Sequence, residues 1–313
     1  MRYKKKLPIG LLLLIDFMII AIYVIVFYGL YYRIPRQLSE SKTAKAEVQK
    51  ESADSLADQF SGHFSDTIEL TDNTYKSKDI SISVTKHTEG SGADTNTYYI
   101  ADIYLTDITC LQSTFADGIY GIGYTDTVLD MDRSLNAILS INGDYYGNGD
   151  NGVVIRNGIL YRSTESDSDV CILYMDGTMK TYSPGTFDAD QSIAEGAWQA
   201  WSFGPELLDE EGKQMTEFNA DWHISKIHPR SAVGYYEPGH YCLIVVDGRQ
   251  RGYSNGMTLT QLSSLFETLG CKAAYNLDGG KSSSMTFSDS EVNHPCDGGR
   301  EVSDCIIIKE VEE

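Results

Sequence analysis

One uninterrupted apolar stretch near the N-terminus constrains this chain more than any other feature. Residues 7–30 are apolar apart from one proline, two glycines and Asp16, and roughly 20 apolar residues suffice to cross the hydrocarbon core of a bilayer. The stretch is longer than the apolar part of a typical signal peptide, and no small-residue cleavage signal follows it. Three lysines at positions 4–6 favour a cytoplasmic N-terminus. We therefore expect a cytoplasmic tail over residues 1–6, one transmembrane helix over residues 7–30, and an extracytoplasmic remainder at the cell membrane.

The sequence after this stretch divides into a polar segment and a longer globular part. Residues 37–60 are rich in Ser, Lys, Glu, Ala and Asp and contain few large apolar side chains, as solvated segments do. The first regular alternation of apolar and polar residues begins at Ile80. We therefore assign residues 31–78 to a stalk and residues 79–313 to a single extracytoplasmic domain.

The charge of the chain limits its partners. The net charge is −20, although residues 1–36 contribute six basic side chains and only one acidic side chain. An acidic surface repels nucleic acid, because contacts to phosphate need a basic patch. We therefore expect no nucleic-acid partner. An anionic substrate would need cations or backbone N–H groups gathered at its site.

The first half of the domain carries the signals of antiparallel hairpins. Residues 80–84 alternate with period two, and so do parts of residues 98–105, which is typical of strands. Asn157 and Gly158 separate two apolar runs and fit a type I′ turn. The residues that follow position 171 predict a second hairpin, with its turn at Asp176 and Gly177.

The second half of the domain changes character. Residues 241–246 form a continuous apolar run, which is typical of a strand buried on both faces. A capping box at Thr258 and Gln261 begins a helical pattern that ends at Gly270, and residues 273–277 form a second apolar run. This order predicts a right-handed parallel βαβ unit. The fold class is therefore expected to be α+β, with mixed sheets, antiparallel hairpins in the first half and the parallel βαβ unit in the second.

Six cysteines follow the apolar stretch, an even number that permits disulfides in an exported domain. None of them lies in a CxxC pair or has the spacing of a zinc site, so a structural zinc ion is not expected. Cys242 and Cys271 would begin the two strands of the βαβ unit. Neighbouring strands would bring them within disulfide reach, so they are the preferred pair.

Two aspartates follow the two strands of the predicted unit. Asp247 comes after the first strand and Asp278 after the second. Both would emerge at the carboxyl edge of a parallel pair, where open sheets bind their ligands. Strands about 4.8 Å apart would place the two carboxylates within several ångströms of each other. Each is followed by glycine, so the backbone could approach a ligand closely, and the serines at 282–284 could help to cradle a phosphate. Asp-Gly is also common turn chemistry, so a purely structural role stays open.

Six segments in register resemble the phosphodiester glycosidase family, over residues 80–308. They are residues 137–147, 202–205, 228–234, 245–249, 276–280 and 293–302. The resemblance implies cleavage of a sugar-1-phosphodiester between the anomeric carbon and its oxygen, which gives a free sugar and a phosphate monoester. Because phosphate is already a weak base, its protonation matters less than it does for the leaving group in ordinary glycoside hydrolysis.

The resemblance and the residues together give a candidate site. Asp278, Asp247 and Asp144 are the candidate catalytic groups. Arg230 is preferred for the phosphate because a guanidinium can bind it in a bidentate manner, and Arg249 comes second. The candidate binding residues are Arg230, Arg249, Asn142, Asn276, Gly279, Gly280, Ser282, Ser283, Asn293 and Arg300. Each arginine could instead form a structural salt bridge, and His228 could carry a proton, although a loop role is favoured.

Two positions depart from the family pattern. Lys281 stands where a third glycine is usual, and many members carry glycine in place of Asp144. Lys281 could add a cation for phosphate or point outward. No cofactor is required by the sequence, and a bound Ca²⁺ or Mg²⁺ is an open option.

Two functions are therefore weighed. The first is a membrane-anchored hydrolase acting on glycosyl phosphodiesters of cell-envelope polymers or exopolysaccharide. The second is a non-catalytic protein of the same fold that binds polysaccharide or helps to assemble a surface polymer.

Overall fold

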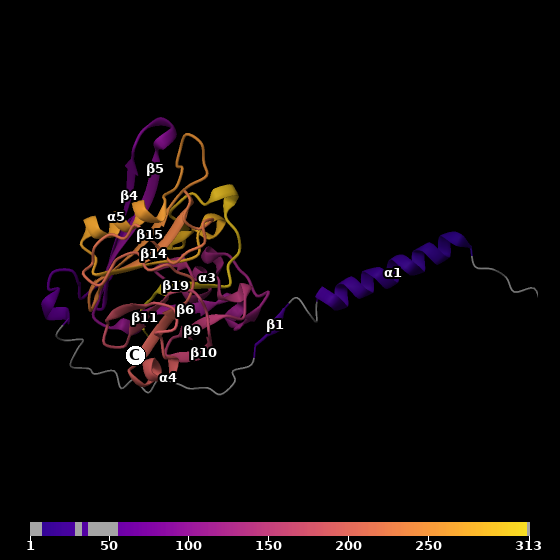
Figure 1. Ribbon diagram of the computed structural model, residues 1–313, viewed down its shortest axis with the longest axis horizontal. Helices are drawn as coiled ribbons and strands as arrows, with labels where there is room; N and C mark the ends of the chain where they lie inside the picture. The colour runs from indigo at the N-terminus through magenta and orange to yellow at the C-terminus, as the bar shows by residue number, and fades with distance from the viewer. Residues whose placement is uncertain (1–7, 29–32, 37–55, 312–313) are drawn as a thin grey trace, which may run out of the picture.

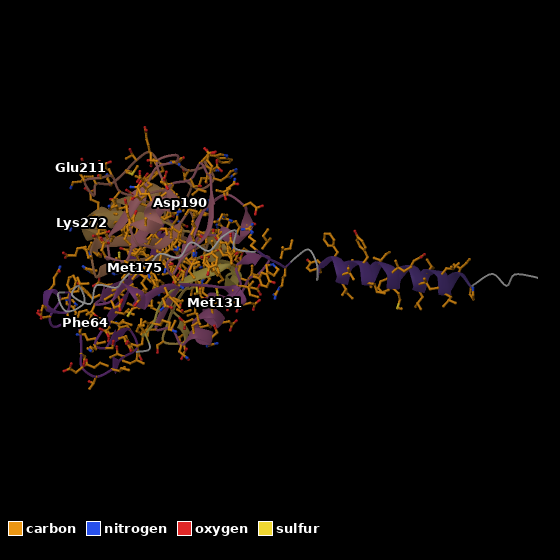
Figure 2. The ribbon with its side chains drawn as sticks, turned by 90° about the horizontal axis from the view of Figure 1, so that it is seen from below. Phe64, Met131, Met175, Asp190, Glu211 and Lys272 are labelled. Carbon is orange, nitrogen blue, oxygen red and sulfur yellow. The ribbon has the colours of Figure 1, made fainter. Side chains whose placement is uncertain are left out.

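The computed structural model describes residues 8–28, 33–36 and 56–311. In this part of the chain, α1 (Ile9–Phe27) stands clear of a globular body formed by the later residues (Figures 1 and 2). No residue of α1 is buried and its mean hydropathy is 2.9, so it is long and apolar enough to cross a membrane. The expected tail over residues 1–6 lies outside the described residues.

A seven-stranded sheet forms one side of the body. In spatial order its strands are β16 (Ala273–Asn276), β14 (Arg230–Glu237), β15 (His240–Val246), β5 (Asn96–Leu105), β4 (Ile80–Glu89), β3 (Thr74–Lys76) and β2 (Glu69–Leu70). The sheet includes β2 and β3, which precede residue 79, where the sequence placed the start of the domain. The body therefore begins within the segment that was assigned to the stalk.

Two five-stranded sheets form the rest of the framework in the described residues. One has the order β18 (Ser290–Glu291), β17 (Met285–Phe287), β8 (Leu139–Asn142), β19 (Asp304–Ile308) and β6 (Leu111–Phe115). The other has the order β10 (Ile159–Thr164), β9 (Gly152–Arg156), β13 (Ala197–Trp201), β11 (Val170–Tyr174) and β12 (Met179–Tyr182). The three sheets share one core, to which they contribute Leu243, Ile141 and Trp201 respectively.

Four helices of the described residues have assigned bounds. Besides α1 they are α3 (Val128–Leu135), α4 (Ala189–Ala194) and α5 (Leu259–Leu269). Short 3-10 turns are η2 (Gly92–Asp94), η3 (Ile108–Cys110), η4 (Ala116–Gly118), η5 (Tyr146–Asn148), η6 (Gly280–Ser282) and η7 (Cys296–Gly298). The expected capping box of α5 is present, and Gly270 ends the helix in the left-handed conformation with φ of 83°. These two signals confirm the predicted helix.

The strand β15 is buried on both faces, as its apolar run predicted. Leu243 and Val245 point into the core shared by the three sheets, whereas Ile244 and Val246 pack with Phe266 of α5 in a second cluster. Burial of such a side chain contributes roughly 1.5–3 kcal/mol. The helix α5 therefore covers one face of the seven-stranded sheet (Figure 1).

The predicted parallel βαβ unit and the predicted mixed sheets are wrong. The strands β15 and β16 are not neighbours, because β14 lies between them and pairs antiparallel with both. All strand pairs among the described residues are antiparallel. The strands β15 and β16 therefore point the same way but stand two strand spacings apart, which is roughly 10 Å rather than 5 Å.

The predicted hairpins are confirmed. The strands β9 and β10 join through Asn157 and Gly158, whose φ values of 52° and 75° fit the type I′ turn. The strands β11 and β12 form the second hairpin, and β4 pairs with β5 along its whole length. The sulfurs of Cys242 and Cys271 lie 3.8 Å apart as free thiols, so this structure contains the preferred pair as neighbours without a disulfide.

A short strand near α1 attaches to the body. The strand β1 (Ile34–Pro35) pairs with β7 (Gly121–Ile122), and Ile34 lies opposite Ile122. The flanking Arg33 forms an ion pair with Asp117 at 3.0 Å, and Arg36 forms one with Asp150. The chain is therefore fixed to the body only a few residues after α1 ends.

Candidate active site

Three loops converge at one edge of the seven-stranded sheet. The amino end of β14 lies between the carboxyl ends of β15 and β16, since Arg230 pairs with Val246 and Ala232 pairs with Asn276. The loops before β14 and after its two neighbours therefore meet. The two aspartates follow strands that end at the same edge, as predicted, although these strands are not adjacent. The end of β8 joins them from another sheet, where Asn142 Nδ2 donates to the Asp278 carbonyl at 2.7 Å.

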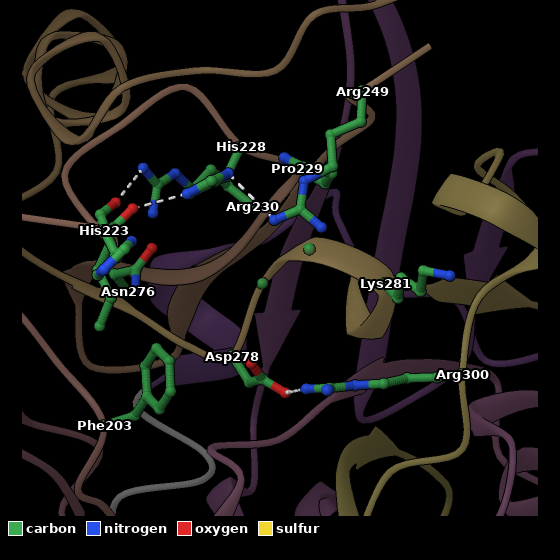
Figure 3. A pocket seen from close by; sticks show the side chains of 13 residues that line it. Phe203, His223, His228, Pro229, Arg230, Arg249, Asn276, Asp278, Lys281 and Arg300 are labelled. Carbon is green, nitrogen blue, oxygen red and sulfur yellow. Dashed lines mark hydrogen bonds and ion pairs between the residues drawn. The ribbon is translucent and has the colours of Figure 1, made fainter.

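These loops surround a pocket of about 350 Å³ (Figure 3). Its walls are Phe203, His223, Ile224, His228, Pro229, Arg230, Arg249, Asn276, Asp278, Gly279, Gly280, Lys281 and Arg300. Asp278 is the single carboxylate among these residues, against three arginines and one lysine. The pocket is therefore rich in basic side chains, although the chain as a whole has a net charge of −20.

Asp278 stands at the base of the pocket with one fixed oxygen. Its Oδ2 accepts hydrogen bonds from Ser282 Oγ and from Arg300 Nη2, both at 2.6 Å. Burial raises the pKa of this carboxyl above its usual range, although Arg300 and Ser282 act in the opposite direction. An acid group in a pocket with a raised pKa is typical of functional sites.

The glycines after Asp278 allow close backbone approach. A Cβ atom on Gly279 would lie 2.7 Å from the Pro229 carbonyl oxygen. Gly280 has φ of 70°, and its Cβ would lie 3.2 Å from Arg249 Nη1. Larger residues at these two positions would displace the loop or the guanidinium.

Arg249 is held by one contact. Its Nη2 donates to His228 Nδ1 at 3.1 Å, and His228 Nε2 contacts the His223 carbonyl oxygen at 2.7 Å. Since a carbonyl only accepts, His228 is the Nε2–H tautomer. Burial lowers the pKa of His228, so the neutral ring orients Arg249. His228 thus has a definite positioning contact beyond the loop role that was favoured.

Arg230, the preferred phosphate ligand, is largely committed elsewhere. Its Nε donates to the Met257 carbonyl at 2.9 Å, and its Nη2 donates to the carbonyls of Ile224 and Lys226 at 2.6 and 2.5 Å. Burial together with the nearby Arg249 lowers its pKa to about 10. No carboxylate of the described residues pairs with it, so its charge adds to the pocket while most of its donors hold the loop.

The side chains of the three residues that follow Gly280 point in different directions. Lys281 points away from the pocket (Figure 3). It pairs with Asp297 at 2.9 Å on the exposed surface. Of its two weighed roles, the structure has the outward one. Ser282 binds Asp278, whereas the buried Ser283 Oγ has no partner among the described residues.

Asp247 does not line the pocket. Its Oδ1 accepts from Asn293 Nδ2 at 2.8 Å, its Oδ2 accepts from the Tyr253 hydroxyl at 2.9 Å, and the His294 backbone N–H reaches both. Asn293 also donates to the Ser283 carbonyl. Asp247 and Asn293 therefore form a buried hydrogen-bonded pair, and neither of them lines the pocket.

Asp144 is fully buried in an ion pair. Arg156 Nη2 donates to Asp144 at 2.8 Å and to Asp304 at 2.7 Å, and the Ser202 backbone N–H donates to the second Asp144 oxygen. A Cβ on Gly143 would lie only 2.2 Å from Asp304. The structure places Asp144 in a supporting network instead of on the pocket surface.

The two asparagines differ. Asn142 is buried and uses both ends, since it binds the Asp278 carbonyl and accepts from Ser231 Oγ at 2.7 Å. Asn276 donates to the Gly204 carbonyl at 2.9 Å, but its Oδ1 has no partner among the described residues. Asn276 lines the pocket, although its Oδ1 is buried.

Several residues of the site carried no readable signal. Arg156 precedes the Asn157 turn and looks like any polar strand residue, because its partners lie far away in the sequence. Phe203 and His223 line the pocket, and only Phe203 stands in a segment of the family pattern. Among residues 8–28, 33–36 and 56–311, no group of three His, Cys, Asp or Glu side chains could hold a metal ion.

The arginines of the pocket can attract an anion, and the carboxyl group of Asp278 lies beside them. The family model for phosphodiester glycosidases matches residues 135–309, more than half of the chain. The chain therefore belongs to the phosphodiester glycosidase family.

Three individual proteins are similar to this chain. The SPbeta prophage-derived uncharacterized protein YomE of Bacillus subtilis (strain 168) is 32% identical over 196 residues, which are 60% of this chain and 30% of that protein. This chain thus spans less than a third of the relative's length.

The other two are solved structures, and they show the fold alone. The zebrafish N-acetylglucosamine-1-phosphodiester alpha-N-acetylglucosaminidase catalytic domain, auto-inhibited by its pro-peptide, has a TM-score of 0.60 at 18% identity, covering 78% of this chain and 88% of that one. A hypothetical protein from Synechocystis has a TM-score of 0.50 at 13% identity, covering 77% and 63%.

Proposed function

We propose that this chain is a membrane-anchored extracytoplasmic hydrolase that cleaves the sugar–phosphate bond of glycosyl-1-phosphodiesters in cell-envelope polymers or exopolysaccharide. The observation that carries the proposal is the pocket in which a single carboxylate, Asp278, lies among three arginine side chains. Family membership supports hydrolysis as the class of reaction. The helix α1 supports the anchor by its length and composition.

Arg249 is the main ligand of the phosphate in this proposal. Arg230 gives three of its hydrogen bonds to backbone carbonyls, whereas Arg249 has one neutral partner, His228. A guanidinium beside Gly280 can meet a phosphate together with the backbone N–H groups of the glycine turn. The buried charge of Arg230 strengthens the local field without direct contact.

Asp278 acts at the anomeric carbon. Water adds across the carbon–oxygen bond, so the sugar gains a hydroxyl and the phosphate leaves as a monoester that takes up the water's other proton. The sugar passes through an oxocarbenium-like state, which a carboxylate stabilises in either stereochemical course. Asn276, which lines the pocket, is placed to bind a sugar hydroxyl or N–H.

The test uses the full chain in detergent and a panel of sugar-1-phosphodiesters, with release of reducing sugar as the readout. We expect turnover by the wild type and a loss of at least about 100-fold in Asp278→Asn. Asp297→Asn is the matched control, since it removes an exposed carboxylate that pairs only with Lys281. Its rate should equal that of the wild type.

The same panel separates the alternative function. A folded wild type that binds several of the compounds and hydrolyses none would favour a polysaccharide-binding or polymer-assembly role. Turnover that survives in Asp278→Asn would refute the assignment of Asp278 while leaving the enzyme class intact.

A further inference from the structure

Arg300 lies where the pocket meets a second cavity. This cavity has a volume of about 380 Å³ and is lined by Arg300 together with Ile122, Tyr145, Asn148 and Ser303. The guanidinium of Arg300 stands 4.8 Å from the centre of the Tyr145 ring and also binds Asp278. One side chain therefore connects the carboxylate of the pocket to the wall of the neighbouring cavity.

The backbone at Tyr145 is unusual. Its φ of 68° and ψ of 23° lie in the left-handed region, which large side chains avoid. Such conformations are strained and cluster at functional sites. Tyr145 is half-buried and carries its ring against Arg300, so the strain coincides with a wall of the cavity.

A third cavity also touches Arg300, but its charge is wrong for an anionic ligand. It is lined by three carboxylates, Asp130, Glu291 and Glu301, and contains no aromatic residue. The cavity at Tyr145 is lined by a single carboxylate, that of Glu301, whose Oε2 already accepts a hydrogen bond from the Thr125 hydroxyl at 2.6 Å. A group attached to a phosphate in the pocket is therefore better placed beside Tyr145.

Arg300 has a donor to spare at this junction. Its Nε and Nη2 bind Ser282 and Asp278 at 2.5 and 2.6 Å, and Nη1 has no hydrogen-bond partner among the described residues. The side chain is 39% exposed, so a ligand can reach it.

We propose that the cavity between Tyr145 and Arg300 binds the alcohol component of the phosphodiester, and that this component is a sugar or polyol unit. A volume of about 380 Å³ corresponds to roughly a dozen water molecules, which is more than enough space for one hexose or hexitol. The Tyr145 ring offers an apolar face, while Asn148 and Ser303 offer hydrogen-bonding groups. This deepens the proposed function and rests on it for the identity of the substrate.

The test compares two phosphate monoesters by titration calorimetry on the full chain in detergent. Methyl phosphate fills only the phosphate position, whereas sorbitol 6-phosphate adds the polyol. We expect the wild type to bind sorbitol 6-phosphate at least about tenfold tighter, which is roughly 1.4 kcal/mol. Tyr145→Asn keeps a residue that tolerates the left-handed backbone and should abolish this preference.

Two further variants keep the result interpretable. Asn148→Ala touches the cavity without touching Arg300, and it should reduce the preference for the polyol while methyl phosphate binding stays unchanged. Glu291→Gln alters only the acidic cavity and should change neither affinity. Equal affinities of the wild type for both monoesters, no binding of either, or a loss caused only by Glu291→Gln would overturn the proposal.

The outcome is separable from the proposed function. A wild type that prefers sorbitol 6-phosphate but hydrolyses no glycosyl phosphodiester would keep the cavity and refute the enzyme. A wild type that hydrolyses methyl and sorbitol phosphodiesters of one sugar with the same KM would keep the enzyme and refute the cavity.

Discussion

The buried network of Arg156 with two aspartates offers a sharp test of what supports the site. All three side chains are 1% exposed, and one cation faces the carboxylates of Asp144 and Asp304. Arg156 also donates to the Ala200 carbonyl. Replacement of Arg156 by Met keeps much of the volume but leaves two carboxyl groups buried side by side without their cation.

Removal of one partner from a buried ion pair costs roughly 3–5 kcal/mol. For a body of this size, each kcal/mol lowers the melting temperature by about 2–4 °C. Arg156→Met should therefore melt roughly 6–20 °C below the wild type. Asp304→Asn should cost much less, because Arg156 then faces one carboxylate and keeps its charge balance.

The pH dependence follows from the second carboxylate. Burial raises the pKa of Asp304 to about 7, and Asp144 acts in the same direction while Arg156 opposes it. The folded state therefore binds a proton that the unfolded chain releases near pH 4. The contribution of Asp304 to stability is fully present below pH 4 and is lost as pH rises through 7.

Denaturant unfolding of the full chain in detergent, followed by tryptophan fluorescence between pH 4 and 8, measures both effects. As pH rises, the free energy of unfolding of the wild type should fall relative to that of Asp304→Asn. A difference that stays constant over this range, or an Arg156→Met protein as stable as the wild type, would refute the account of the network.

Two further predictions concern the phosphate position. Gly280→Ala should raise the KM for a phosphodiester, because its Cβ would press on Arg249; Gly298→Ala shares the positive φ but meets nothing within 4 Å, and should leave KM unchanged. Equal effects would show that backbone strain alone is responsible. Because burial lowers the pKa of His228, binding of dimethyl phosphate should be constant down to about pH 6.5 and weaken below it, where protonation removes the acceptor for Arg249. Titration calorimetry would test this, and the same pH dependence in His228→Gln would contradict it.

The sequence predicts those parts of the fold that depend on neighbours along the chain. The turn at Asn157 and Gly158 and both ends of α5 are local, because the residues that make each contact lie within a few positions of one another. The glycines after Asp278 belong to this class as well. Their conformation and close approach follow from residue type and position.

The neighbours of a strand are not encoded locally, and this explains the error in the βαβ unit. The run over residues 241–246, the helix and the run over residues 273–277 fit parallel neighbours and also fit strands separated by a third. The strand β14 comes earlier in the chain and enters between them. Pairing over such a distance leaves no mark in the periodicity of either strand.

The same limit applies to the aspartates. Sequence placed Asp247 and Asp278 at one edge, and the loops do meet there. It did not show that Asp247 is taken up by Asn293 and Tyr253, or that Asp144 faces Arg156. These partners come from separate loops and sheets, so the direction of each carboxylate is a tertiary property.

The strand β1 has a consequence for the working range of the protein. Five peptide units separate Tyr28 from Arg33, so this stretch reaches at most about 18 Å. Residues 37–55 join two points of the same body, since β1 is paired with β7 and the described chain resumes at residue 56. The length of that segment therefore does not change the distance between the body and the end of α1. In the proposed membrane-anchored form, the body of the protein stays close to the bilayer surface. It therefore meets its substrates by lateral diffusion within a thin layer above the membrane.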